Sequence, residues 1–112
     1  MHGAPLPDLQ FAFANPALNG NTLLVPGQPG NIAIRVISVL LVMSGGVGVK
    51  FTGANSGDLS ATFPVLANGG FVLPGNQYGW LQTAANEALN INLNSAVSGG
   101  VHISWIPVQL KG

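Results

Sequence analysis

The stretch that decides the fold is GWLQTAANEALNINLN, from Gly79 to Asn94. Its second half alternates strictly between apolar and amide side chains, with Leu89, Ile91 and Leu93 set against Asn90, Asn92 and Asn94. That period is typical of a half-buried strand, because successive side chains leave opposite faces of a sheet. A helix would instead mix leucine with asparagine on one side. The stretch therefore predicts a strand–turn–strand unit with an amide ladder on its outer face and a polar turn at 83–87.

Similar short apolar segments recur along the whole chain, separated by glycine, proline and asparagine. The segments expected to be strands lie at 10–14, 22–25, 31–44, 47–52, 59–65, 71–73, 79–82, 88–94, 101–106 and 108–110, some of them joined or weak. Turn residues every 8–12 positions or so indicate an antiparallel sandwich or barrel. We expect an all-β, jelly-roll-like β-sandwich of eight or nine short strands. An immunoglobulin-like sandwich is the second choice, because the chain has no cysteine for the usual Cys–Trp–Cys pattern.

The length of 112 residues suits one domain. Residues 1–20, which include Pro5 and Pro7, are interpreted as an extended N-terminal arm, and residues 21–112 as a single β-sandwich domain. Gly45-Gly46 is interpreted as the turn of a hairpin that joins the strand at 31–44 to the strand at 47–52. The hydrophobic content of 47% argues against a disordered chain.

Charged residues make up only 5% of the chain, and the formal net charge is zero. A free monomer with so little charge tends to self-associate, so we expect partners to cover much of the surface. Three basic residues provide no electrostatic footprint for nucleic acid. The longest apolar run, Val36–Met43, is far shorter than the roughly 20 residues that a membrane span requires. Neither a nucleic acid nor a membrane is expected as a partner.

The segment Asn31–Ser44 contains a run, Val39 to Met43, in which every residue is apolar. Such a run is expected where both faces of a strand are covered, here by the core and by a subunit interface. The residues expected at an interface are Phe11, Phe13, Val39, Leu41, Met43 and Trp80. For Phe11 and Phe13 a second interpretation stays open, in which they belong to an ordinary first strand of the domain's own sheet.

No pattern in the sequence predicts an active site, and we expect neither enzymatic activity nor a cofactor. A hydrolase would need a serine, His102 and Asp58 or Asp8, but there is no G-x-S-x-G motif. His102 is interpreted as an ordinary strand residue on a polar face. Paired carboxylates would have to come from Asp8, Asp58 and Glu87, which are interpreted as solvated turn or arm residues.

Two possible binding sites each have a simpler interpretation. Asn55, Ser56 and Asp58 could offer oxygens to calcium, but a single carboxylate and a spacing unlike an EF-hand make a loop the better interpretation. Tyr78, Trp80 or Trp105 could stack on sugars, since some jelly rolls are lectins. Each of these aromatic residues adjoins apolar strand positions, which favours packing in the core or at an interface.

Four segments of the sequence form a pattern of turns and strands: Lys50-Phe51-Thr52, Leu66-Ala67-Asn68-Gly69-Gly70, the segment 79–93 (GWLQTAANEALNINL) and Val97-Ser98-Gly99-Gly100-Val101. Through these segments the chain resembles, over residues 31–106, small virion proteins of tailed bacteriophages. It implies a capsid decoration (cement) protein that forms a homotrimer on the virion capsid, contacts the major capsid protein and is assembled in the host cytoplasm. A tail, fibre or baseplate module, which could bind carbohydrate, is the alternative within the same class.

Overall fold

The computed structural model describes residues 8–110, and these residues form ten β-strands. In chain order the strands are β1 (Gln10–Ala14), β2 (Gly20–Val25), β3 (Ile32–Met43), β4 (Val47–Gly53), β5 (Gly57–Asp58), β6 (Phe63–Val65), β7 (Gly70–Leu73), β8 (Leu81–Gln82), β9 (Leu89–Leu93) and β10 (Gly99–Gln109). Within this part of the chain no helix has the length and apolar character to span a membrane. The predicted all-β antiparallel sandwich is confirmed.

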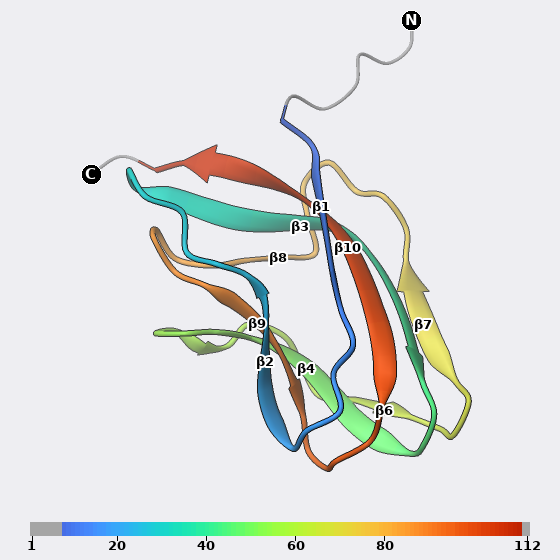
Figure 1. Ribbon diagram of the computed structural model, residues 1–112. Helices are drawn as coiled ribbons and strands as arrows, with labels where there is room; N and C mark the ends of the chain where they lie inside the picture. The colour runs from blue at the N-terminus through green and yellow to red at the C-terminus, as the bar shows by residue number, and fades with distance from the viewer. Residues whose placement is uncertain (1–7, 111–112) are drawn as a thin grey trace, which may run out of the picture.

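The strands pair in nested order, as if one long hairpin had been folded over on itself. β1 pairs with β10, β2 with β9, β3 with β7 and β8, and β4 with β5 and β6, all antiparallel. Rolling this hairpin brings β10 beside β3 and β9 beside β4. The result is two facing sheets, β1-β10-β3-β7 with β8, and β2-β9-β4-β5 with β6 (Figure 1). This nested and rolled pairing is the topology of a jelly roll.

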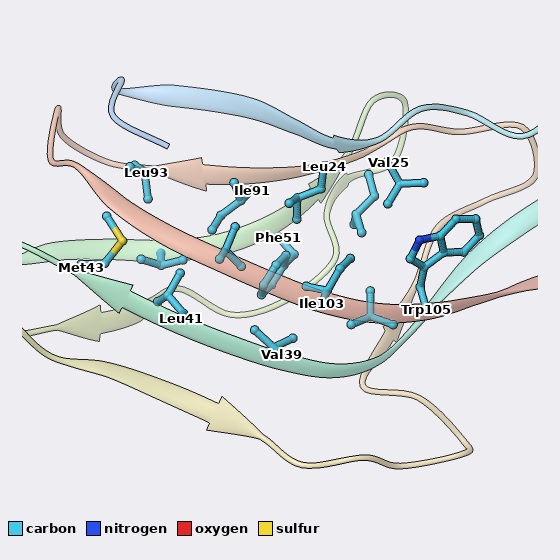
Figure 2. Packing of buried hydrophobic residues seen from close by; sticks show 14 of the residues in the cluster. Leu24, Val25, Val39, Leu41, Met43, Phe51, Ile91, Leu93, Ile103 and Trp105 are labelled. Atoms are coloured by element: carbon cyan, nitrogen blue, oxygen red, sulfur yellow. The ribbon is translucent and has the colours of Figure 1, made fainter. Parts of the chain in front are cut away.

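The core lies between the two sheets and is almost entirely apolar. Leu89, Ile91 and Leu93 of β9 each have 0% of their surface exposed, as their alternation predicts. They belong to one cluster with residues of the other sheet such as Leu41 and Ile103. Figure 2 shows Ile91 and Leu93 on one side of this core and Leu41 and Ile103 on the other. The asparagines of β9 point away from the core. The amide of Asn92, for example, donates to Oδ1 of Asn21 at 2.9 Å.

A β-bulge in β3 determines which of its apolar side chains enter the core. Ser104 pairs with Ser38 and Trp105 pairs with Val36, so Ile37 is an extra residue on β3. The bulge shifts the alternation by one residue, because side chains in a strand alternate with a period of two. The inward positions after the bulge are 39, 41 and 43.

The interface prediction for three residues of β3 is therefore wrong. Val39, Leu41 and Met43 are 2%, 1% and 0% exposed and belong to the core. Their neighbours Leu40 and Val42 are 52% and 53% exposed on the outer face. The apolar run was expected to have one face in the core and the other at an interface. Because of the bulge, the residues on the outer face of the strand are 40 and 42.

Two local connections differ from the prediction. Gly45-Gly46 does not close a hairpin, because β3 and β4 lie in different sheets. The backbone N–H of Met43 donates to Gly69 O, and that of Ser44 donates to Ser98 O. Beyond Ser44 the chain crosses from one sheet to the other. The segment Gly79–Asn94 also crosses, since β8 pairs with β3 whereas β9 pairs with β4.

The first and the last of the described strands, β1 and β10, both belong to the first sheet. β1 is an edge strand of the domain's own sheet, so the sandwich begins at Gln10 and not at residue 21, as the predicted arm of residues 1–20 implied. Residues 1–7 of that arm lie outside the described residues. β10 continues through Pro107, although separate strands were predicted at 101–106 and 108–110. β1 pairs with β10 only as far as Trp105, so the missing N–H of Pro107 removes no bond to β1.

A charge in the core should prevent folding. We expect Ile91→Asp to abolish the cooperative thermal transition, because an unpaired buried carboxylate costs more than about 4 kcal/mol, a large part of a domain's stability. Circular dichroism melting measures this. The matched control is Asn90→Asp, on the other side of the same strand, which should melt close to the wild type. Equal melting of the two variants would contradict the assignment of faces.

Candidate functional site

The outer side of the β1-β10-β3-β7 sheet carries an exposed apolar row that crosses four strands. Phe13 pairs with His102, His102 pairs with Leu40, and Leu40 pairs with Val72, so these side chains lie next to one another. Phe13, Leu40 and Val72 are 71%, 52% and 63% exposed. With the adjacent Phe11 and Val42 they form a continuous surface, here named the outer face: Phe11, Phe13, Leu40, Val42, Val72 and His102.

Two phenylalanines project from the edge of the outer face and pack against the same histidine. The ring centroids of Phe11 and His102 are 6.2 Å apart in an edge-on arrangement. Those of Phe13 and His102 are 6.1 Å apart and the rings are stacked. Aromatic pairs in such arrangements are worth about 0.5–1.5 kcal/mol beyond the area that they bury. The phenylalanines are therefore held in place although 67% and 71% of their surfaces are exposed.

A hollow lies beside Phe13, where glycine replaces a side chain. Gly100 and Gly70 flank Val42 in the row next to the phenylalanine row. A shallow pocket of about 320 Å³ opens there, lined by residues that include Phe13, Leu40, Val42, Gly100 and His102. A Cβ placed on Gly70 would collide with the carbonyl of Leu41, whereas one on Gly100 would approach only Asn15 Oδ1, at 3.8 Å. Position 70 thus requires glycine because the backbone of Leu41 lies too close for a side chain. At position 100 a side chain would fit, so Gly100 leaves the space above β10 empty.

The charged side chains carried by the strands lie away from the outer face. Lys50 and Asp58 form an ion pair of 2.9 Å on the opposite sheet. Arg35 is on β3 on the far side of the bulge, where its Nε donates to Gln82 at 2.8 Å. Among the described residues the outer face thus consists of apolar side chains and one histidine.

Trp80 lies on the same sheet but not in the outer face. Its backbone N–H donates to Val36 O at 2.8 Å. Val36 precedes Leu40 by four residues, so Trp80 lies roughly 13 Å from Leu40 along β3. Its indole N–H donates to Pro74 O at 2.8 Å, which leaves the ring 43% exposed. Tyr78, two residues earlier, is 80% exposed, whereas Trp105 is buried at 5%. Two of the three aromatic residues considered for sugar stacking are thus accessible, both in the β7–β8 connection.

The residues considered for hydrolysis are dispersed. His102 contacts the two phenylalanine rings, and Ser104 on the same strand shares a hydrogen bond of 2.5 Å with Ser38. Asp58 is in β5 of the other sheet. Across residues 8–110 no three His, Cys, Asp or Glu side chains come together in a group that could hold a metal.

Glu87 is buried, contrary to the prediction of a solvated turn residue. It is 1% exposed, and its carboxylate accepts hydrogen bonds from the backbone N–H groups of Asn55, Ser56 and Ala84 and from the Ser56 hydroxyl. Gly53 makes room for it, since a Cβ there would lie 2.5 Å from the carboxyl carbon. The carboxylate thereby fastens the turn after β4 to the segment before β9.

The environment of Glu87 acts on its pKa in two directions. Burial raises the pKa of Glu87, because it disfavours the charged form. Hydrogen bonds from Ala84, Ser56 and Asn55 lower it by more, so that the pKa lies below its usual value of 4.5. The carboxylate is therefore ionised at neutral pH and acts as a structural acceptor. The N–H and hydroxyl groups around Glu87 already donate to its carboxylate, so they do not form a binding site for a ligand. The outer face is therefore the candidate functional site.

Comparison with known proteins adds no assignment. No protein-family model matches the sequence, and no curated protein matches it.

Acid should weaken the fold through Glu87. A group whose folded pKa is depressed stabilises the fold above its unfolded pKa, and that contribution is lost as the pH falls through the folded pKa. We expect the melting temperature of the wild type to decrease once the pH is lowered beyond about 4.5. Glu87→Gln should be less stable at pH 7, by about 1–3 kcal/mol, and should show a shallower loss in acid.

Thermal melting between pH 7 and pH 3 measures both effects. The matched control is Asp58→Asn, because Asp58 is an exposed carboxylate whose ion pair contributes little. An acid profile of Glu87→Gln as steep as that of the wild type would contradict the role given to this carboxylate.

Proposed function

We propose that this protein is a structural virion protein of a tailed bacteriophage, a capsid decoration (cement) protein. In this role it forms a homotrimer, binds the outside of the head and bridges major capsid subunits. The observation that carries the proposal is the outer face, an apolar surface exposed on a chain with 5% charged residues. Contiguous exposed apolar patches of several hundred Å² mark interaction sites in soluble proteins.

The energetics of the outer face suit a protein that acts by burying surface. Its five large apolar side chains expose on the order of 500 Å² together, taking about 200 Å² for a whole phenylalanine. Burying that area against an equal area of a partner is worth roughly 25 kcal/mol before costs. Association costs an estimated 4–15 kcal/mol or more in lost freedom. The surplus is enough for a stable contact without a charged pair.

The fold and the charge distribution support the same role. Jelly rolls build viral capsid domains as well as lectins, so the topology agrees with the resemblance of residues 31–106 to phage virion proteins without being specific to it. A contact without charges depends weakly on salt. A cement protein of this kind would keep its hold on the head over a wide range of ionic strength.

One observation favours the alternative, a tail, fibre or baseplate module that binds carbohydrate. Tyr78 and Trp80 expose their rings from the same short connection, and Asn76 Oδ1 accepts from the Tyr78 N–H at 3.0 Å. Exposed aromatic rings next to amide groups are a surface on which a sugar can stack. The outer face has no part in this alternative, so the two functions can be tested separately.

The decoration role predicts saturable binding to phage heads. We expect the purified chain to cosediment with expanded heads that lack it, and to raise the temperature at which those heads release DNA. Binding should change little between low and high salt. Leu40→Asp in the outer face should lower the occupancy, while Leu66→Asp, an equally apolar residue exposed at 82% in the β6–β7 connection, serves as the control. A chain that stays in the supernatant and leaves DNA release unchanged would contradict the proposal.

The carbohydrate alternative predicts a response from a single tryptophan. Because Trp105 is buried and Trp80 is 43% exposed, a bound sugar should shift the fluorescence of Trp80. Titration with a glycan panel measures this, and Tyr78→Ala should weaken any binding by about tenfold. A flat response across the panel would eliminate this alternative.

A further inference from the structure

The outer face has complementary features side by side. Phe13 projects at 71% exposure, and the hollow over Gly100 lies immediately next to it. The volume of about 320 Å³ is ample for a phenyl ring entering from outside. A surface that carries both a projecting ring and an unfilled hollow can be matched by a second copy of itself.

We propose that the occupant of the outer face is a second copy of this chain, with Phe13 of one copy seated in the hollow over Gly100 of the other. The inference deepens the proposed function and rests on it, since it names the contact between copies within the assembly. Phe13 is the anchor residue, and Val42 and Leu40 form the wall of the hollow that receives it.

The chemistry of the outer face favours a copy of the chain over an unrelated protein. Interfaces between identical chains are more apolar than those between different proteins, where charged pairs set the choice of partner. The outer face carries no Asp, Glu, Lys or Arg, so two copies can face one another without like-charge repulsion. A different partner would find no charge there by which to recognise it.

The area is also of the right order. A stable interface buries about 800 Å² on each partner. The apolar side chains of the outer face supply on the order of 500 Å². Ser38 and Asn15 border it and can supply polar rim contacts. An aromatic anchor in a desolvated hollow, with a polar rim around it, is the arrangement that concentrates binding energy.

Two substitutions test the two halves of the contact separately. Phe13→Ser removes the projecting ring. Gly100→Val fills the hollow, and it should not disturb β10, because a Cβ there meets only Asn15 Oδ1 at 3.8 Å and valine suits a strand. Leu66→Ser, which removes an exposed apolar side chain outside the outer face, is the control. Circular dichroism melting of each variant confirms that it folds.

Sedimentation equilibrium of the full chain measures the association. We expect the wild type and Leu66→Ser to associate into multiples of the 11.4 kDa chain, and the mass distinguishes a pair from a ring of three. Phe13→Ser and Gly100→Val should each weaken association by about tenfold or more. An equimolar mixture of the two variants should associate more strongly than either alone, because the mixture retains one intact ring and one intact hollow.

Three results would overturn the inference: a monomeric wild type at about 100 μM, association unchanged in both variants, or a mixture no stronger than its components. Cosedimentation of the same variants with phage heads separates this inference from the proposed function. Binding to heads without self-association through the outer face would leave the function standing and the inference wrong. Self-association through the outer face without binding to heads would support the inference and contradict the proposed function.

Discussion

The pairing of β3 with β10 is the interaction on which the rest of the sandwich depends. The ladder runs from Ile32 opposite Gln109 to Met43 opposite Gly99, the longest in the described residues. It places β10, the last described strand, in the middle of a sheet, with β1 on the free edge of β10 and β7 and β8 on the free edge of β3. The nested pairs could not close into a jelly roll without it, because within residues 8–110 no other ladder links the two halves of this sheet.

The single irregularity in that ladder also sets the chemistry of the surface. The extra residue Ile37 reverses the facing of everything after it on β3. Leu40 and Val42 consequently join His102 and the phenylalanines of β1 on the outside, while Val39, Leu41 and Met43 fill the core. One bulge thus accounts for a core that is complete on the inside and an apolar surface that is exposed on the outside. The proposals on decoration and on self-association both begin from this asymmetry.

Features encoded in local patterns could be predicted, and features that depend on distant residues could not. The alternation at 89–94 identified three core residues and an amide face correctly, because polar and apolar residues differ there at every step. Every residue from Val39 to Met43 is apolar, so the sequence does not indicate which side chains face the core. The one-residue bulge before this run therefore exchanged the predicted inner and outer residues. Gly45-Gly46 has hairpin chemistry, but turn residues do not encode which sheet the next strand joins. Glu87 takes its donors Asn55 and Ser56 from more than thirty positions away, which no local pattern reveals.

A cryo-EM reconstruction of the particle that carries this chain tests the central claim most directly, because it shows what covers the outer face. The account predicts that Phe13, Leu40 and Val72 are buried against a second copy of the chain within a decoration complex on the head. An outer face open to solvent in the assembled particle, with the chain held through its other surfaces, would contradict it.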